Sequence, residues 1–342
     1  MKHLKIALIG FGGIARSHFA AYTKLIREGA PIRLVAVCDA NIEQFSRQIT
    51  INNSSQTVIL TDDIHTYTSV DDMLVREAFD MADICLPTHL HKDFSVKLLR
   101  AGKHVLCEKP MALCFADCEE MVRASHESGC QLLIGQCLRF SVPYLYLKKC
   151  IDEKPFGNIL DLHMHRASES PHWSNGNWLH MAEKSGGCIL DTHIHDVDIA
   201  HFLFGKPLAV STLECNCPPY WQTQNTRLFF DNITVTADGS WHDMPNTGFS
   251  AGYKARFEHA NLILHDGAVT VYPDGGDAYV AALPQDDYVR AEIDYFVNVL
   301  LSDAPNTINP PESARDTVHI IEHMKQSAAC GGEKIAYVPK EN

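Results

Sequence analysis

Short apolar runs alternate with amphipathic segments over the first third of the chain. The apolar runs predict buried strands, and the segments between them space their apolar residues along one face of a helix. The predicted strands cover residues 5–10, 33–39, 81–87 and 104–110, and the predicted helices cover residues 14–29, 70–79 and 91–103. Strands separated by helices indicate a parallel, doubly wound α/β sheet.

The pattern changes after about residue 124. Long strand-like runs follow with little helix between them, which is typical of an antiparallel sheet in an α+β domain. These runs cover residues 157–168, 208–216, 226–241 and 249–273, and helical patterns over residues 288–301 and 310–329 close the chain. We therefore expect two domains, residues 1–124 and residues 125–342.

Composition narrows the class of protein. The chain has 342 residues, of which 46% are hydrophobic and 21% charged, and this length suffices for two domains with separate cores. No apolar run approaches the ~18 residues of a membrane span, and the first apolar run reads as a strand rather than a signal peptide. A net charge of −13 without a basic cluster makes nucleic acid an unexpected partner. Twelve scattered cysteines without a CxxC pair indicate reduced thiols in a cytoplasmic protein.

The sequence GFGGIA at residues 10–15 fits the G-x-G-x-x-A pattern of dinucleotide-binding loops. Gly10 allows a tight turn, Gly12 lets the backbone approach a pyrophosphate, and the following helix offers free N–H groups to the phosphates. Asp39 ends the second predicted strand, where an acid hydrogen-bonds the ribose hydroxyls. Because Asp39 would repel a 2′-phosphate and has no arginine beside it, we expect NAD rather than NADP. The cofactor candidates here are Gly10, Phe11, Gly12, Gly13, Ile14 and Asp39.

The stretch AGKHVLCEKPMA at residues 101–112 adds a family resemblance. Together with GFGGIA and the Gly-Gly…Asp…His run over residues 186–198, it resembles the Gfo/Idh/MocA oxidoreductases. That family includes glucose–fructose oxidoreductase and inositol 2-dehydrogenase, and the resemblance covers almost the whole chain. It implies a Rossmann domain followed by a domain with an open, mainly antiparallel sheet, which would join subunits into a homodimer or homotetramer. It also implies a sugar, polyol or related small molecule as substrate.

The resemblance implies roles for individual residues. Lys109 matches the family's active-site lysine, which could hydrogen-bond the substrate oxygen and stabilise negative charge that develops on it. PTHLH at residues 87–91 and GQCLRF at residues 135–140 resemble segments of the family that line the cofactor and the substrate. The further cofactor candidates are Pro87, Thr88, His91, Glu108 and Gln136, and Arg139 is a substrate candidate.

The stretch GGCILDTHIHDVD at residues 186–198 could be a metal site or an acid–base site. Barrel amidohydrolases aim a similar pair of histidines at a metal, but such a barrel needs ~200 residues or more. Only about 150 residues follow here, without alternating strands and helices. In a helix, His193 and His195 point about 200° apart and cannot share a metal, so no metal site is expected. Asp191, His195 and Asp198 fall on one face of such a helix.

The family places its catalytic aspartate and histidine at the positions matching Asp191 and His195. His195 is then the candidate base that takes the hydroxyl proton as hydride leaves, and Asp191 would orient it or bind a neighbouring hydroxyl. Many members have glycine where this chain has His193, whose ring could narrow the pocket. Weaker candidates for the pocket wall are His165, Trp173, Trp178 and Tyr288.

Three functions fit these features. The first is an NAD-dependent dehydrogenase that acts on a secondary alcohol with Lys109, Asp191 and His195. The second is a glycosidase of the same family that uses NAD transiently. The third is a regulator that senses the cofactor, which would not need those three residues together.

Overall fold

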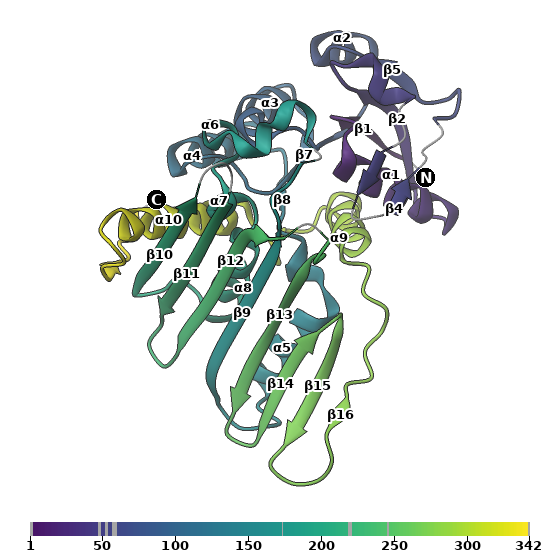
Figure 1. Cartoon of the computed structure of the whole chain (residues 1–342). Helices are drawn as coiled ribbons and strands as arrows, with labels where there is room; N and C mark the ends of the chain where they lie inside the picture. Colours follow the sequence, from purple (N-terminus) through teal and green to yellow (C-terminus); the bar gives the residue numbers. More distant parts are fainter. Residues whose placement is uncertain are drawn as a thin grey trace. The chain divides into compact units, whose positions relative to one another are not determined.

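The computed structural model describes residues 3–46, 49–51, 54–56, 60–172, 174–217, 221–244 and 246–340. The chain forms two compact units (Figure 1). Residues 1–137 and 287–315 make up the first unit, and residues 138–286 and 316–342 make up the second. The predicted boundary at residue 124 falls inside a helix, Phe115–Ser128, and the first unit also includes a helix from late in the chain.

A parallel sheet of six strands forms the centre of the first unit, in the order β5-β2-β1-β6-β7-β8. The strands are β1 (Leu4–Ile9), β2 (Ile32–Cys38), β5 (His65–Tyr67), β6 (Met81–Ile84), β7 (His104–Glu108) and β8 (Leu132–Gly135). β1, β6 and β8 are apolar almost without interruption because both of their faces are buried. The strand order reverses between β1 and β6, and ligands of such sheets bind beyond the carboxyl ends at this point.

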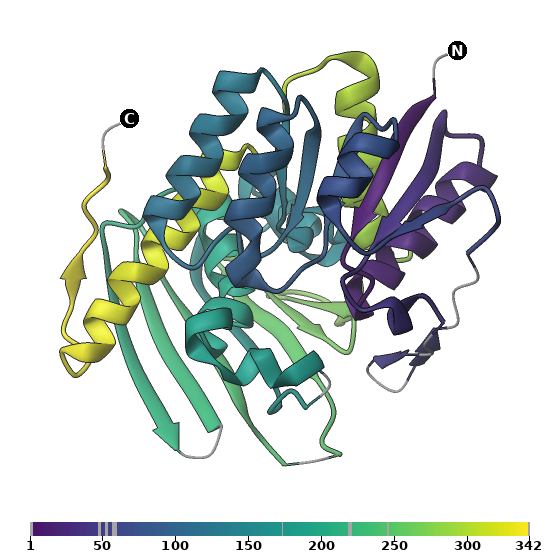
Figure 2. The same ribbon diagram turned by 90° about the horizontal axis from the view of Figure 1, so that it is seen from above.

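Helices pack against the strands of this sheet. They are α1 (Gly13–Arg27), α2 (Val70–Arg76), α3 (His91–Arg100), α4 (Phe115–Ser128) and α9 (Tyr288–Ser302). α3 and α4 lie side by side (Figure 2). α9 packs along α1, and its Ile293 and Phe296 share a buried cluster with Tyr22. Because the apolar face of α9 packs into the core of the first unit, α9 belongs to that unit although it comes late in the chain. β3 (Ile49–Ile51) and β4 (Ser54–Gln56) form a separate pair.

A sheet of nine strands forms the second unit, in the order β16-β15-β14-β13-β9-β12-β11-β10-β17. Neighbouring strands are antiparallel except for the parallel pair of β9 and β12. The strands are β9 (Ile159–Glu169), β10 (Ala209–Cys217), β11 (Trp221–Phe229), β12 (Thr234–Asp243), β13 (Ser250–Phe257), β14 (Ala260–His265), β15 (Ala268–Pro273), β16 (Tyr279–Val280) and β17 (Ile335–Ala336). The run over residues 226–241, predicted as one extended segment, thus spans two strands that meet at a turn. The predicted fold class, a parallel Rossmann sheet plus a mainly antiparallel sheet, is confirmed.

Helices of the second unit pack on one face of its sheet. They include α5 (Val142–Glu153), α7 (Cys188–Asp191), α8 (Ile194–Phe204) and most of α10 (Pro311–Ala329), whereas α6 (Ala182–Ser185) contacts the short helix Asn175–His180. Arg166 on β9 contacts both Tyr144 on α5 and Asp196 on α8, so these two helices cover the same face (Figure 1). Burial alternates along β9, with Leu162, Met164 and Arg166 buried toward the helices.

Two further findings bear on the class of protein. In the described ranges, none of the helices combines the length and the apolar character that a membrane crossing requires. Eleven cysteines whose side chains are described are free thiols, and seven of them are buried. Most of these thiols therefore belong to apolar cores.

Candidate functional site

The glycine loop joins β1 to α1 at the carboxyl edge of the parallel sheet. Gly10 has a φ of +83°, and a Cβ there would lie 2.6 Å from the carbonyl oxygen of Cys85. The fold of the protein therefore requires glycine at position 10, whether or not a cofactor binds. A Cβ on Gly12, in contrast, would meet nothing within 4 Å. This open space beside the backbone is where the dinucleotide pattern places a pyrophosphate.

The start of α1 is suited to an anion. Gly12 provides no side-chain cap, and the first turn of the helix carries no acidic residue. The free N–H groups and the positive end of the helix dipole therefore stay available for phosphate oxygens. Ile14 is 40% exposed beside the loop, whereas the Phe11 side chain is fully buried and packs edge-on against Phe19. Only the backbone of Phe11 can serve the predicted cofactor contact.

Asp39 links the second strand to the glycine loop. Its Oδ2 accepts a hydrogen bond of 2.7 Å from the Phe11 N–H, and its Oδ1 accepts one of 2.8 Å from the Asn41 N–H. The side chain stays partly exposed. A carboxylate fixed in this way still has lone pairs for ribose hydroxyls, because each oxygen accepts more than one hydrogen bond.

A substitution at Gly12 separates cofactor binding from folding. Serine is a good N-cap and meets no protein atom at this position, so Gly12→Ser should leave the melting temperature unchanged or slightly higher. The same side chain occupies the predicted pyrophosphate space and should weaken NAD binding at least about tenfold, or about 1.4 kcal/mol. Calorimetric titration with NAD and a thermal scan measure the two effects. Gly10→Ala is the matched control, because its Cβ clashes with Cys85 and should lower stability. Undiminished NAD affinity in Gly12→Ser would remove the loop from the site.

The loop after β6 contains the candidates Pro87, Thr88 and His91. Thr88 and His91 are buried, and Pro87 is partly exposed. The His91 ring nitrogens lie 2.8 Å from the Pro110 carbonyl oxygen and 2.7 Å from that of Leu86. His91 thus bridges this loop and the loop after β7, and its contacts favour a structural role over the predicted direct contact with the cofactor.

Lys109 and Gln136 follow the ends of β7 and β8. Lys109 is partly buried, and its backbone N–H donates to Oε2 of Glu108 at 3.0 Å. Gln136 is 1% exposed, and neither atom of its amide group has a hydrogen-bond partner among the described residues. A buried amide without partners costs free energy unless a ligand supplies them. Four features together fit a dinucleotide. They are the uncapped start of α1, the open space at Gly12, the carboxylate of Asp39 and the side-chain amide of Gln136.

The stretch with the predicted acid–base pair is helical but interrupted. α7 ends at Asp191 and α8 begins at Ile194, and the His193 N–H bonds to the Cys188 carbonyl five residues back. This wider turn changes the helical phase that the sequence predicts. Between residues 187 and 201 every residue is buried except Asp191 and His195, which are both partly exposed. Asp198, predicted to share their face, is buried instead.

Two buried ion pairs fix the orientation of α8. The Arg166 guanidinium donates to both carboxylate oxygens of Asp196, at 3.2 and 3.3 Å. Arg139 donates from Nε and Nη2 to Asp198 at 2.8 and 2.7 Å, and Thr317 adds a third bond to that carboxylate at 2.9 Å. Arg139 is 2% exposed. These contacts favour a structural role for Arg139 over the predicted contact with substrate.

His193 faces the sheet rather than a pocket. It is completely buried, its Nε2 shares a hydrogen bond of 3.0 Å with Thr226, and its ring fills the space beside Gly239, where a Cβ would lie 2.7 Å from Nδ1. Burial lowers the pKa of His193 to about 4. As the pH is lowered from about 6.5 to 4, the unfolded chain takes up a proton at this histidine that the folded chain does not. The stability of the folded chain therefore decreases as the pH is lowered through this range. The expectation that this ring narrows the pocket is not supported, since the ring packs on β12.

The fit of His193 to Gly239 can be tested by a double-mutant cycle. Gly239→Ala should destabilise the second unit by about 1–3 kcal/mol, because the added methyl group overlaps the imidazole. His193→Ala removes the overlap, so the double variant should be at least about 0.5 kcal/mol more stable than the sum of the single effects. Urea denaturation of the four proteins measures this coupling. Strictly additive effects would show that the two side chains do not touch.

The remaining candidates lie on other elements than α7 and α8. His165 alternates with Met164 and Arg166 on β9, so it points to the opposite face of the sheet, where its Nε2 contacts Ser250 Oγ at 3.1 Å. This orientation and the contact with Ser250 favour a structural role for His165 over the predicted place on the pocket wall. Trp178 is partly exposed in a short helix, Asn175–His180, and Tyr288 is 38% exposed as the first residue of α9. Trp173 lies outside the described residues.

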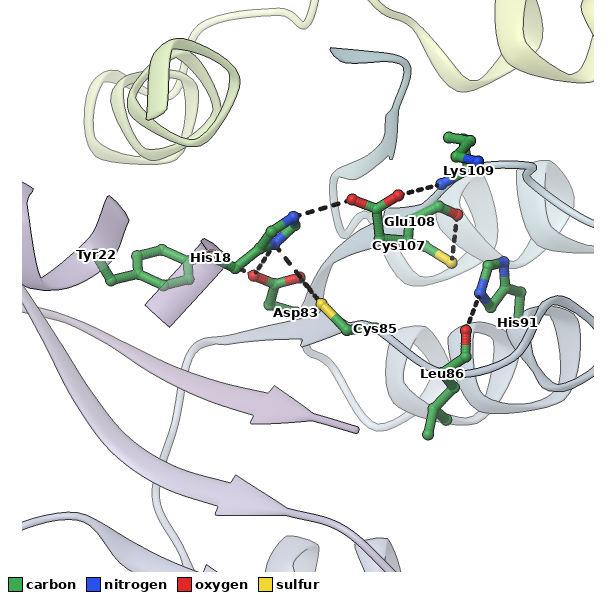
Figure 3. A network of polar contacts seen from close by, with 9 residues as sticks. All are labelled: His18, Tyr22, Asp83, Cys85, Leu86, His91, Cys107, Glu108 and Lys109. Atoms are coloured by element: carbon green, nitrogen blue, oxygen red, sulfur yellow. Dashed lines mark hydrogen bonds and ion pairs between the residues drawn. The ribbon is translucent and has the colours of Figure 1, made fainter. Parts of the chain in front are cut away.

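The sequence prediction did not single out His18 and Asp83. Figure 3 shows His18 on α1 between Asp83 of β6 and Glu108 of β7. All three side chains are buried, although each can carry a charge. The available signal was an aspartate inside the apolar run MADICL and a histidine four residues before Tyr22 on the buried face of a helix.

Comparison with known proteins matches both units. A family model described as an oxidoreductase family with an NAD-binding Rossmann fold matches residues 4–136. A model of the Gfo/Idh/MocA C-terminal domain matches residues 144–246. The chain belongs to the Gfo/Idh/MocA family. The resemblance predicted from GFGGIA, Glu-Lys-Pro and the later Asp…His run is therefore confirmed.

Individual relatives in the Gfo/Idh/MocA family differ in their reactions. The chain is 30% identical over 198 residues to 2,7-anhydro-N-acetylneuraminate hydratase of Mediterraneibacter gnavus, covering 58% of this chain and 50% of that protein. It is 28% identical over 206 residues to inositol 2-dehydrogenase of Salmonella typhimurium, covering 59% of this chain and 55% of that protein. The match thus spans about half the length of these curated relatives. The fold resembles that of aldose-aldose oxidoreductase from Caulobacter crescentus, with a TM-score of 0.80, 21% identity and coverage of 98% and 99%.

Proposed function

We propose that the protein is an NAD-dependent dehydrogenase that oxidises a secondary alcohol of a sugar, a cyclic polyol or a related metabolite. The observation that carries the proposal is the exposure pattern of residues 187–201, in which only Asp191 and His195 escape burial. A helical stretch that buries its other polar side chains and leaves an acid and a histidine partly exposed is suited to proton transfer. The relative named inositol 2-dehydrogenase acts on a substrate of this class.

The proposal assigns one role to each side chain. His195 takes the hydroxyl proton of the substrate, since an imidazole can accept and return a proton near neutral pH. Asp191 orients His195 or binds a neighbouring hydroxyl. Lys109 donates a hydrogen bond to the substrate oxygen and stabilises the negative charge that develops there. NAD, when bound, accepts the hydride from the substrate carbon.

NAD is proposed over NADP because of Asp39. Its carboxylate is held by two backbone N–H groups at the end of β2, and a 2′-phosphate would bring a second negative charge to it. Ala40 and Asn41, which follow Asp39, supply no cation to offset that repulsion. Binding constants for the two cofactors, measured side by side, test the preference.

The appearance of NADH tests the main proposal. The purified protein is incubated with NAD and a panel of inositols, aldoses, sugar acids and amino sugars. NADH should form when the wild type meets one group of compounds. The variant Lys109→Ala should form no NADH with the same compounds. Absence of NADH across the panel, from protein that binds NAD by calorimetry, would contradict a dehydrogenase acting on these classes.

A second candidate is an enzyme that uses NAD transiently without net oxidation. The observation in its favour is the relative named as a hydratase, because hydration of a substrate leaves its overall oxidation state unchanged. This reaction class includes glycosidases as well as hydratases, and both would consume substrate without accumulating NADH. Nuclear magnetic resonance of the substrate panel distinguishes them from the dehydrogenase: product formation without NADH supports the second candidate.

We also propose that the nine-stranded sheet joins subunits into a homodimer or homotetramer. Leu213 on β10 and Tyr272 on β15 leave apolar side chains exposed on this sheet. Association of copies would cover such side chains, and burial of apolar area favours assembly. Light scattering of the full chain should give two or four times the monomer mass of 38.2 kDa.

A further inference from the structure

A buried chain of hydrogen bonds runs through the first unit to the backbone of Lys109 (Figure 3). The Tyr22 hydroxyl donates to Oδ2 of Asp83 at 2.9 Å, and the His18 Nδ1 lies 2.8 Å from the same oxygen. The other His18 nitrogen, Nε2, lies 2.9 Å from Oε1 of Glu108. Oε2 of Glu108 then accepts the Lys109 N–H at 3.0 Å.

The positions of the partners favour protons on both nitrogens of His18. Each nitrogen faces a carboxylate oxygen, and a carboxylate accepts hydrogen bonds but donates none. A neutral imidazole would leave one carboxylate facing a lone pair inside the protein, which is costly. His18 and Asp83 are both 0% exposed, so water cannot replace the missing proton. The geometry therefore favours an imidazolium between two carboxylates.

The charges around His18 agree with this state. Burial lowers the pKa of His18, but Asp83 and the neighbouring Cys85 oppose that effect, and the net result is a pKa well above the ordinary value. Burial raises the pKa of Glu108, yet the hydrogen bond and charge of His18 and the contacts with Lys109 together outweigh burial, and the net pKa is lowered. Further titratable groups lie near this chain of hydrogen bonds: Tyr22 on α1, Cys107 on β7, Lys109 after β7, His91 at the start of α3 and, facing Tyr22, Glu292.

Metal binding is the alternative reading of the same residues. His18, Asp83 and Cys85 bring their ligand atoms within 4.8 Å of one another, the one group of this kind in the described part of the chain. Both His18 nitrogens, however, already contact carboxylate oxygens at hydrogen-bond distance. Burial also raises the pKa of the Cys85 thiol, which opposes the thiolate form that binds metals. Hydrogen bonding explains the geometry better.

We propose that His18 is a positioning residue for the reaction: it holds Glu108, and Glu108 holds the backbone of Lys109. The inference rests on the proposed function, in which Lys109 contacts the substrate oxygen. His18 itself touches neither substrate nor cofactor in this scheme. The charge of His18 holds the Glu108 carboxylate, and this carboxylate holds the backbone N–H of Lys109. A displacement of about 1 Å at a catalytic group can lower a rate by about 10²-fold.

The first test is His18→Gln in the full chain. Glutamine can donate a hydrogen bond to Glu108 but carries no charge, so the buried carboxylates lose their cation. We expect kcat to fall by about 10- to 100-fold, with the KM for NAD within about threefold of the wild type because α1 still offers its N–H groups. The double variant His18→Gln/Glu108→Gln restores a neutral pair of hydrogen bonds and should recover part of kcat. Tyr22→Phe, the matched control, removes a hydrogen bond from the same Asp83 and should keep kcat.

Two measurements detect the charge itself. Nitrogen resonances of labelled protein should show both His18 nitrogens protonated at neutral pH. A folded pKa above the unfolded one stabilises the protein fully below about pH 6.5, and this stability is lost as the pH rises through the folded value. The melting temperature of the wild type should therefore drop more between pH 6.5 and alkaline pH than that of His18→Gln.

Each outcome separates this inference from the proposed function. If Lys109→Ala abolishes turnover and His18→Gln does not, the inference fails and the proposed function stands. If Lys109→Ala keeps full turnover, the role proposed for Lys109 fails, and the positioning of the reaction by His18 fails with it. If the wild type binds NAD but forms no NADH with any compound of the panel, the proposed function fails. A His18 ring with one unprotonated nitrogen, or metal bound stoichiometrically to the purified protein, would overturn the inference in either case.

Discussion

Replacing His195 by alanine is expected to lower kcat by about 10²–10⁴-fold, the usual contribution of a positioned acid–base group. In the proposed reaction, the hydroxyl proton of the substrate has no other assigned acceptor. NAD binding should persist, because the glycine loop and Asp39 that fit the cofactor belong to the first unit. Steady-state kinetics and a calorimetric NAD titration measure the two quantities.

His193→Ala is the matched control for this prediction. It removes the same side chain two residues earlier, but from a buried position against Thr226 and Gly239. Its effect should fall on stability and leave kcat of the folded protein within a few-fold of the wild type. If His195→Ala keeps full turnover, or if both variants lose it equally while folded, then His195 has no specific role as the base.

The cofactor loop could be predicted from sequence because its chemistry is local. A glycine with positive φ, an open backbone at the helix start and an acid after the next strand each follow from neighbouring residues, and the positions of Gly10, Gly12 and Asp39 agree with that pattern. The same locality explains the correct prediction of a parallel sheet, since nearly continuous apolar strands must be covered on both faces.

The set of side chains that α7 and α8 leave exposed could be predicted only in part from the sequence. A regular helix places Asp191, His195 and Asp198 together, but the wider turn at Thr192 and His193 shifts the phase, and Asp198 becomes buried. Spacing alone cannot reveal such a turn. Asp198 pairs with Arg139, 59 residues earlier in the chain, and no pattern within either segment names the other as partner.

The buried histidine of α1 was missed for a related reason. Helical spacing places His18 on the apolar face, but a histidine among apolar residues does not reveal which strands lie opposite. The partners come from β6 and β7, 65 and 90 residues away along the chain. A charge inside an apolar strand, such as Asp83, is the one local sign that a buried partner exists.

Replacing Asp198 by alanine is expected to give the largest loss of stability among these variants, about 3–5 kcal/mol, because it leaves the Arg139 guanidinium buried and without its partner. Arg139 and Asp198 are 2% and 1% exposed, so water cannot take over the lost hydrogen bonds. Thr317 also loses its acceptor, which adds to the cost. Urea denaturation of the wild type and the variant measures the difference.

The double variant Arg139→Met/Asp198→Leu shows whether the cost comes from the uncompensated charge. Both replacements are apolar and similar in length, so the double variant should be more stable than Asp198→Ala, although it breaks the same ion pair. Asp152→Ala is the matched surface control, because its exposed pair with Lys148 should contribute at most about 1 kcal/mol. A loss below about 1 kcal/mol for Asp198→Ala would mean that Arg139 finds another acceptor or reaches water. In that case the ion pair would not be what orients α8, and the accessibility of Asp191 and His195 would need another cause.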